Sequence, residues 1–282
     1  MQKIIFIGIG LIGGSLALAL KKNNPRVEIY AIDTDEKNLE QAIKNKVIDK
    51  KADYSDIENA DVIILACPVS ASKSVFIEIA KHKLKPTVLI SDVGSVKKSV
   101  IDAAKEVFGK VPENFIPAHP IAGLEKSGVQ FAQDDLFKNN LTILTTSDNS
   151  DEKSLDKARK LWELTGARVE IMSAESHDLI LAATSHLPHI LAFLFIDVLA
   201  EKSPDGAIFN YAGSGFRDFS RIAGSSAQVW RDICMENKDA VLTLVDEYAC
   251  KLQEFRNLLA DKQKIEVEEL FSRASRVRSK LS

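Results

Sequence analysis

Residues 3–33 read KIIFIGIGLIGGSLALALKKNNPRVEIYAID, and this stretch decides the fold of the first half of the chain. It begins with an apolar, β-branched run, passes through a glycine-rich turn into an apolar helical pattern, and ends in a second apolar run that closes on Asp33. This order of strand, loop, helix and strand predicts a parallel β-α-β unit. Residues 4–20 carry no charge, but their glycines and the surface turn that follows argue against a signal peptide or a membrane span.

The turn between the first strand and the helix carries three spaced glycines. Glycines at these positions allow a tight turn, close approach of a pyrophosphate and close packing of helix on strand, and the helix N-terminus offers N–H groups to phosphates. Asp33 lies twenty residues after Gly13, where a carboxylate accepts hydrogen bonds from ribose hydroxyls and repels a 2′-phosphate. The alternatives are an FAD-binding variant and a strand–helix turn that binds nothing. We predict an NAD site formed by Gly8, Gly10, Leu11, Ile12, Gly13 and Asp33.

The alternation of strands and helices continues to about residue 172. Short apolar runs predict further strands at 62–66, 88–91, 115–118, 141–145 and 168–172, and helical patterns cover 14–22, 36–45, 71–81, 96–108 and 151–165. This rhythm is typical of an α/β fold in which helices cover both faces of a parallel sheet. We therefore predict a doubly wound, Rossmann-type domain over residues 1–172.

After residue 172 helical patterns follow one another without strands. Ser173 can cap a helix that runs to about Leu199, and Pro188 should kink that helix. Later helical patterns cover roughly 227–257 and 267–281, with glycine-containing loops at 205–224. We expect an all-helical domain for substrate binding and dimerisation over residues 173–282.

The composition favours a soluble protein with a small-molecule partner. The 282 residues are about twice the commonest domain size, and 45% hydrophobic with 27% charged residues is typical of globular proteins. A net charge of −3 offers no general attraction for nucleic acid or for a membrane surface. Cys67, Cys234 and Cys250 are too few and too scattered for a disulfide framework or a zinc site, so we expect a reducing, cytoplasmic location and no metal.

Two residues of the first half follow predicted strands directly, at the sheet edge where a dinucleotide presents its nicotinamide. His119 follows the 115–118 strand, and imidazole is suited to taking a proton from a hydroxyl group as hydride leaves. Ser95 follows the 88–91 strand. The structural alternatives are a loop histidine bonded to backbone, and a serine that serves as the N-cap of the next helix.

The helical half carries two further polar groupings. His186 and His189 lie three residues apart, on one face of a helix beside a proline that frees a carbonyl. They fit a polar pocket wall or hydrogen-bonded core histidines better than a metal pair, because no third ligand is near in sequence. Arg217 and Arg221 lie four residues apart next to a glycine-containing loop and could clamp a carboxylate, or they could form a surface helix face with Asp218 as counter-charge.

Together these motifs resemble the prephenate/arogenate dehydrogenase family of tyrosine biosynthesis. The resemblance spans nearly the whole chain in the same order, and it is carried by the glycine motif with Asp33, DVGSVK at 92–97, HPIAGLEKSG at 119–128, SHLPH at 185–189 and GFRDFSRIA at 215–223. It implies NAD-dependent oxidative decarboxylation of prephenate to 4-hydroxyphenylpyruvate, carbon dioxide and NADH. It also implies a homodimer joined through the helical domains. Neither the fused chorismate mutase nor the C-terminal regulatory domain of some relatives is expected.

The resemblance implies individual roles as well. His119 would hydrogen-bond the 4-hydroxyl of the substrate and accept its proton, and Ser95 would bond near the same hydroxyl and the nicotinamide. Arg221 would bind a substrate carboxylate, His189 would contribute to substrate binding, and Trp230 would approach the site of the partner subunit. The residues expected to shape the pocket are Asp218, Ser185, Ser225 and Glu125.

Other functions stay open at this point. Arogenate dehydrogenase differs only in a substrate that carries an amino group in place of the keto group. A β-hydroxyacid dehydrogenase shares the layout but would ordinarily use a lysine on the long helix, and residues 179–199 contain none. A non-catalytic, NAD-sensing dimer would bind NAD and form no NADH with prephenate.

Overall fold

The computed structural model describes residues 2–124 and 126–281. The chain divides into two compact units, Met1–Asn237 and Lys238–Ser282. The first unit contains all the described strands together with the helices up to α9, and the second contains α10 and α11. The domain boundary at residue 172, expected from the change in sequence pattern, stays a prediction.

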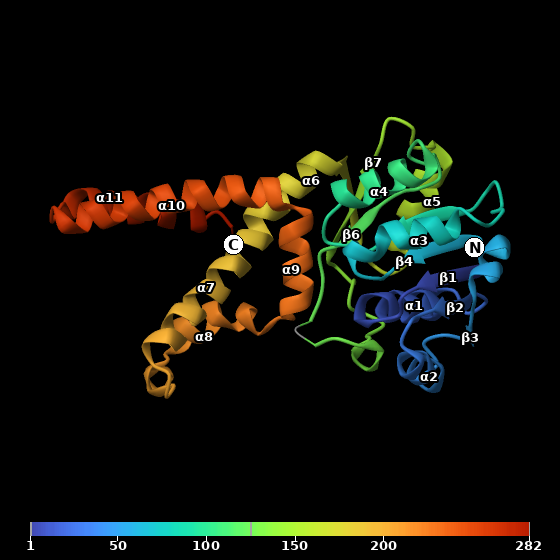
Figure 1. The fold of residues 1–282 in the computed structure, drawn as a ribbon, viewed down its shortest axis with the longest axis horizontal. Coiled ribbons are helices and arrows are strands. Elements are labelled where there is room, and N and C mark those ends of the chain that lie inside the picture. The colour runs from blue at the N-terminus through green and yellow to red at the C-terminus, as the bar shows by residue number, and fades with distance from the viewer. Residues whose placement is uncertain (1, 125, 282) are drawn as a thin grey trace. The chain divides into compact units, whose positions relative to one another are not determined.

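A five-stranded parallel sheet forms the centre of the first unit (Figure 1), with strand order β3-β2-β1-β4-β5. Its strands are β1 (Lys3–Ile7), β2 (Glu28–Ile32), β3 (Lys50–Lys51), β4 (Val62–Leu65) and β5 (Leu89–Asp92). In β1, Ile5 pairs with Tyr30 on one side and with Ile63 on the other. The chain order reverses beside β1, and this is the place where such sheets bind ligands at the carboxyl ends of their strands.

Helices cover both faces of this sheet, as the sequence predicts. Alternate residues of β1 point to opposite faces, so that Ile4 and Phe6 belong to one buried apolar cluster and Ile5 and Ile7 to another. Figure 1 shows α1 and α2 on one side of the sheet and α3 and α4 on the other. The helices of the first cluster are α1 (Leu11–Asn23), α2 (Glu36–Lys44) and α5 (Glu152–Glu163), and those of the second are α3 (Ser72–Ile79) and α4 (Lys98–Phe108).

The strand expected at 115–118 is only partly correct. Phe115 forms a single parallel bridge to Ile90, and the strand proper is β6 (Ala118–Pro120), which pairs antiparallel with β7 (Leu141–Thr146). Parallel pairing with β5 stops because Pro117 has no N–H and the N–H of Ala118 bonds to the carboxylate of Asp92. β7 pairs in parallel with β8 (Arg168–Ser173), and these three strands form a second, mixed sheet in which His119 lies in the middle of β6.

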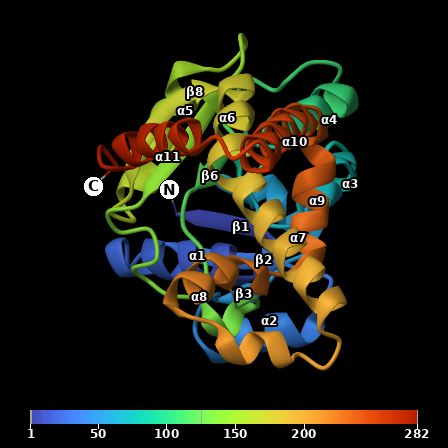
Figure 2. The same ribbon diagram turned by 90° about the vertical axis from the view of Figure 1, so that its left-hand side faces the viewer.

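The long helical run after β8 consists of α6 (Ala174–Leu181), a π-helical turn (Ala182–His186) and α7 (Leu187–Lys202). The Ser173 hydroxyl accepts a hydrogen bond from the N–H of Ser176 at 3.1 Å, so the predicted N-cap is confirmed. The π turn ends at His186, and Pro188 lies in the first turn of α7, where its missing N–H costs least, so the kink expected at Pro188 stays a prediction. Helix α6 is in contact with α4, and Figure 2 shows α7 continuing the helical run from α6.

The rest of the helical sequence is more divided than its pattern suggests. The predicted helix at 227–257 is interrupted at Asn237, giving α9 (Ala227–Glu236) and α10 (Lys238–Ala260). In the second unit α10 is followed by α11 (Lys264–Arg278), and the rings of Phe255 and Phe271 pack 5.7 Å apart. The remaining short helices are α8 (Ser214–Ser220) and the 3-10 turns Tyr54–Asn59, Val69–Ala71, Val129–Phe131, Ala207–Tyr211 and Arg221–Gly224.

The run Ala174–Lys202 is also long and apolar enough to cross a membrane, judged by length and composition. Most of its apolar window is not buried within this chain, and Leu179, Leu194 and Val198 are about half exposed or more. Exposed apolar side chains of this kind are typical of a surface that packs against another subunit.

Candidate active site

The glycine loop has the geometry that a dinucleotide phosphate needs. Gly8 has φ +88°, and a Cβ there would lie 2.6 Å from the carbonyl oxygen of Ala66; a Cβ on Gly13 would lie 2.8 Å from the Ala66 side chain. A Cβ on Gly10 would meet nothing within 4 Å. Gly8 and Gly13 therefore let the loop and helix pack on the end of β4, while Gly10 leaves open space on the outer side of the loop.

Helix α1 begins at this loop with its terminal N–H groups unused by side chains. Gly10 is the N-cap residue, it provides no side-chain cap, and the first turn has no acidic residue. Leu11 is buried and Ile12 packs against the first apolar cluster, so both fix the start of the helix. The positive end of the helix dipole is left available to an anion, and the loop and helix fit a bound pyrophosphate.

Asp33 lies at the end of β2 as predicted, and the structure shows how it is held. Its carboxylate accepts hydrogen bonds from the N–H of Ile9 and the side-chain amide of Asn38, both at 3.0 Å, and from the N–H of Asp35 at 2.9 Å. Asn38 also donates to the carbonyl of Ile9. Asp33 is half-buried beside the glycine loop, where a ribose would bind. Asn38 carries no sequence signal of its own and was missed.

His119 comes from β6 and is held by a second histidine. Its Nδ1 lies 2.8 Å from Nε2 of His177 on α6, and the two rings meet edge to face. His119 is only 9% exposed and His177 is fully buried. Nε2 of His119 has no hydrogen-bond partner in the described part of the chain and is not among the fully buried polar atoms, so it is the ring nitrogen open to a ligand.

Asp178 anchors this pair to a helix N-terminus. Nδ1 of His177 bonds to its carboxylate at 2.7 Å, and the N–H groups of Lys97 and Lys98, at the start of α4, donate to the same carboxylate at 2.9 Å. Burial opposes ionisation of Asp178, but these three donors outweigh it and lower the pKa of the carboxyl. Asp178 is therefore a buried anion at the positive end of α4.

Ser95 is not the N-cap of α4, so that structural alternative is wrong. The helix begins at Lys98 and Lys97 is its N-cap residue, and the capping oxygens come from Asp178. Ser95 instead lies half-buried in the loop between β5 and α4. Its hydroxyl is thus left at the carboxyl end of β5, on the edge that presents the nicotinamide in folds of this type.

A buried ion pair holds β6 in place. The ammonium group of Lys97 hydrogen-bonds Asp92 at the end of β5 and donates to the carbonyl of Ala118 at 2.9 Å. Asp92 in turn accepts from the N–H of Ala118 at 3.0 Å. Burial lowers the pKa of Lys97, and the charge and hydrogen bond of Asp92 oppose that shift. Both groups bond to the residue that precedes His119, so they fix the position of its backbone.

The surroundings keep His119 neutral. Burial lowers its pKa well below the usual 6.5, and the charges on His177, Lys97 and His186 lower it further. A neutral imidazole with one nitrogen held and the other free is suited to accept a proton.

The two histidines of the SHLPH motif behave differently. His186 is buried, and its Nδ1 lies 3.2 Å from the side-chain nitrogen of Asn237; burial lowers the pKa of His186 to about 4. His189 is half-buried, donates from Nδ1 to the carbonyl of Ser185 at 2.9 Å, and stacks on Trp230 with 3.7 Å between ring centroids. Because Nδ1 is used in this bond, Nε2 is the nitrogen of His189 that remains for a ligand.

Arg221 begins the 3-10 turn after α8, and its side chain is exposed. The pKa of His189 is lowered by burial and also by the charge of Arg221, against a hydrogen bond to Ser185 that raises it. In the same way the charge of His189 lowers the pKa of His186, and the charge of His186 lowers the pKa of His119. Arg221, His189, His186 and His119 are thus successive neighbours, and their assembly into one site stays a prediction.

The remaining expected residues are less closely tied to this group. Ser185 is half-buried in the π turn, Asp218 is exposed on α8, and Ser225 is half-buried at the end of the Arg221 turn. Glu125 lies outside the described residues. Trp230, which the resemblance assigns to the partner's site, stacks on His189 of its own chain. Within residues 2–124 and 126–281 no three His, Cys, Asp or Glu side chains are grouped to hold a metal ion.

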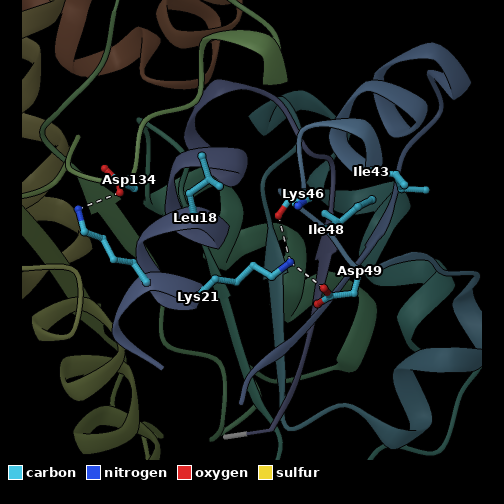
Figure 3. Close-up of a pocket in the computed structure, with 8 residues that line it drawn as sticks. Leu18, Lys21, Ile43, Lys46, Ile48, Asp49 and Asp134 are labelled. Carbon is cyan, nitrogen blue, oxygen red and sulfur yellow. Dashed lines mark hydrogen bonds and ion pairs between the residues drawn. The ribbon is translucent and has the colours of Figure 1, made fainter. Parts of the chain in front are cut away.

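A separate surface hollow lies beside α1 (Figure 3). Four of its charged groups already bond to one another, because Lys21 pairs with Asp49 at 2.7 Å and Lys22 with Asp134 at 2.8 Å. It offers a ligand little that is not already bonded.

The fold, the glycine loop and the held His119 together define a nucleotide-dependent dehydrogenase. Two sequence profiles match the chain: that of the prephenate dehydrogenase nucleotide-binding domain at residues 16–171, and that of the prephenate dehydrogenase dimerization domain at residues 173–273. The chain belongs to the prephenate dehydrogenase family.

Individual relatives agree with this assignment. Prephenate dehydrogenase of Bacillus subtilis is 38% identical over 90% of this chain and 69% of its own length. The crystal structure of prephenate dehydrogenase from Aquifex aeolicus, in complex with hydroxyphenyl propionate and NAD+, superposes with a TM-score of 0.92 at 32% identity, over 100% of this chain and 99% of that one. The crystal structure of Synechocystis arogenate dehydrogenase superposes with a TM-score of 0.83 at 28% identity, and both chains are covered completely.

Proposed function

We propose that this protein is a prephenate dehydrogenase that uses NAD. The conversion removes hydride from the ring carbon that bears the 4-hydroxyl, releases the ring carboxylate as carbon dioxide, and yields 4-hydroxyphenylpyruvate and NADH. Bound NAD supplies the hydride acceptor. The protein's own residues position the ring, take up and return one proton, and neutralise the carboxylates.

His119 is the proton acceptor in this proposal. Its Nε2 takes the proton of the 4-hydroxyl as hydride leaves the same carbon. The electron pair of the bond to the departing carboxylate then flows into the ring and makes it aromatic, and His119 returns the proton to the phenolate oxygen. Ser95, at the end of β5, hydrogen-bonds the same hydroxyl and the nicotinamide.

The helical half binds the rest of the substrate. Arg221 pairs with a substrate carboxylate. Its exposed side chain lies close enough to His189 for its charge to lower the pKa of that residue, so both can contact one substrate. His189 offers Nε2 to the substrate side chain. Ser185, Asp218, Ser225, Glu125 and Trp230 complete the pocket wall in the proposal.

The observation that carries the proposal is the state of His119: neutral, held at Nδ1 and open at Nε2, on an NAD-type fold with relatives of this name. A non-catalytic sensor has no use for a proton acceptor in this place.

The direct test follows NADH absorbance with purified protein, NAD and either prephenate or arogenate. We expect NADH formation with prephenate at a kcat/KM at least ten-fold above that with arogenate. A higher kcat/KM with arogenate would make arogenate the substrate. The similarity to an arogenate dehydrogenase is the reason for testing it. NAD binding without NADH formation from either substrate would favour the non-catalytic NAD sensor instead. Replacing NAD with NADP tests the repulsion that Asp33 should exert on a 2′-phosphate.

We also propose that the protein works as a cytoplasmic homodimer. The half-exposed apolar side chains of Ala174–Lys202 lie within the matched dimerization domain, and a partner copy would bury them. The three scattered cysteines support a reducing compartment, because their spacing does not suit a disulfide framework. Analytical ultracentrifugation tests the dimer, and fractionation of the producing cells tests the location; a monomer or a membrane-bound protein would contradict the respective part.

A further inference from the structure

His177 and Asp178 form a hydrogen-bonded chain behind His119 that the proton transfer itself does not require. The chain runs from Nδ1 of His119 to Nε2 of His177 at 2.8 Å, and from Nδ1 of His177 to the Asp178 carboxylate at 2.7 Å. Neither His177 nor Asp178 was singled out from the sequence, although both lie in the first turns of the predicted helix.

The direction of each proton in this chain follows from its anchored end. Asp178 is an anion that accepts from the N–H groups of Lys97 and Lys98, so it can only accept from His177. Nδ1 of His177 therefore carries a proton, and Nε2 of a neutral His177 is a lone pair. That lone pair must accept from His119, so Nδ1 of His119 carries the proton and its Nε2 is bare.

The opposite arrangement is electrostatically excluded for neutral rings. A proton on Nε2 of His119 would require Nε2 of His177 to donate to Nδ1 of His119. Nδ1 of His177 would then present a lone pair to a carboxylate oxygen 2.7 Å away, inside a fully buried pair of groups. Two facing lone pairs in a dry interior repel strongly.

We propose that His177, oriented by Asp178, is the positioning residue that sets the tautomer of His119, so that Nε2 faces the substrate as a proton acceptor. The proposal rests on the proposed function for the role of His119 in turnover. In the same geometry the buried Asp178 anion stabilises the imidazolium that forms when His119 takes up the proton, with no further proton transfer along the chain.

The other charged groups around this chain have separate partners. Lys97 bonds to Asp92 and to the carbonyl of Ala118, and Nδ1 of His186 bonds to Asn237. Asn237 also donates to the backbone carbonyl of Asp178 at 2.8 Å, which holds the start of α6 against the end of α9. The buried groups whose charges act on His119 are Lys97, His177 and His186. Of these, only His177 hydrogen-bonds the ring of His119.

Three substitutions separate this role from a purely structural one. His177→Leu removes the acceptor, and His177→Gln keeps an oxygen that accepts from Nδ1 of His119. His82→Leu makes the same change at the half-buried histidine that pairs with Glu58, outside the site. With prephenate and NAD we expect kcat of His177→Leu to fall about a hundred-fold, which is the usual cost of a misplaced catalytic group, with KM changed less than three-fold. His177→Gln should recover at least ten-fold of that loss, and His82→Leu should match the wild type.

NMR of the free enzyme with nitrogen-labelled histidine tests the tautomer without relying on turnover. The signal of His119 is assigned by its loss in His119→Asn, and that of His177 by its loss in His177→Gln. We expect Nδ1 protonated and Nε2 bare for both rings at neutral pH. A protonated Nε2 on His119, or a His177 protonated on both nitrogens, overturns the proposal.

The two readouts distinguish failure of the inference from failure of the proposed function. If NMR shows the expected tautomers but prephenate yields no NADH, the hydrogen-bonded chain is supported and the assigned reaction is refuted. Normal turnover in His177→Leu, with unchanged thermal unfolding and NAD affinity, would refute the positioning role and leave the reaction standing. If His177→Leu does not fold, NMR of the wild type still tests the tautomer of His119, and kcat of His177→Gln still tests the positioning role of His177.

Discussion

At the scale of single residues, burial and a few hydrogen bonds decide what each side chain of the site can do. His119 and His189 both have one ring nitrogen held, by His177 and by the Ser185 carbonyl, and the other makes no hydrogen bond to residues 2–124 or 126–281. His186 has the same chemistry but is fully buried against Asn237, which leaves it a structural role. Their positions in the sequence alone do not distinguish these cases.

The pH dependence of turnover reports the environment of His119. Its pKa is lowered by burial and by the charges on His177, Lys97 and His186, so the neutral form persists on the acid side of 6.5. We expect kcat/KM with prephenate to stay level from neutral pH down through pH 6.5 and to fall only well below it, as the base becomes protonated. A pH profile that has lost half of its plateau at pH 6.5 or above would show that the ring is not desolvated as described.

Arg221 should contribute binding more than chemistry. Arg221→Ala removes a charge-assisted contact worth about 1.5–3 kcal/mol, so KM for prephenate should rise roughly ten- to hundred-fold while kcat changes little. Arg256→Ala is the control, because it removes the same group from the exposed surface of α10, where no binding role is expected. Steady-state kinetics check both variants, and equal KM values for wild type and Arg221→Ala would rule out the carboxylate contact.

At the scale of elements, the sequence predicts those parts of the fold that local patterns encode. The strand, glycine loop and helix at residues 3–23 form as predicted, and Ser173 caps α6. The antiparallel pairing of β6 and the Asp178 cap of α4 were not predictable, since both depend on bonds between residues distant in sequence. Asp33 lies directly after β2 as predicted, whereas His119, expected just after a strand, lies within β6. Asn38, His177 and Asn237 were missed because their hydrogen bonds join separate segments of the chain.

Two glycines of the cofactor loop should respond differently to the same change. Gly8→Ala places a Cβ against the Ala66 backbone at a positive φ, so the free energy of unfolding should fall by at least about 1–3 kcal/mol. Gly10→Ala meets open space and should change stability by no more than about 0.5 kcal/mol, yet raise the dissociation constant of NAD at least ten-fold by obstructing the pyrophosphate. Chemical denaturation and NAD titration measure the two effects; tight NAD binding by Gly10→Ala would place the phosphates elsewhere.

At the scale of the whole molecule, the site ties the sheet to the helices that follow it. Asp178 caps α4 from α6, Asn237 joins the end of α9 to α6, and Ser70 after β4 bonds to Asp232 on α9 at 3.0 Å. The groups that orient His119 are therefore also groups that hold the first unit together. Protonation of buried histidines should accordingly weaken both activity and folding.

His186 gives this coupling a measurable sign. Burial lowers its folded-state pKa from the usual 6.5 to about 4, so below pH 6.5 the unfolded chain binds a proton that the folded chain does not. Above pH 6.5 the burial of His186 costs no proton. As the pH falls below 6.5 the free energy of unfolding decreases, by about 3 kcal/mol near pH 4. His186→Gln should remove that part of the pH dependence. Denaturant unfolding of both proteins at pH 7 and pH 4 provides the test, and parallel losses would assign the effect to other groups.

The most direct test of the central claim, that His119 is the proton acceptor for hydride transfer from prephenate, is the comparison of His119→Asn with the wild type. The amide cannot take up the proton, so kcat for prephenate-dependent NADH formation should fall by roughly a hundred- to ten-thousand-fold, while NAD affinity and thermal unfolding stay close to the wild type. Turnover by a folded, NAD-binding His119→Asn enzyme at the wild-type rate would contradict the account.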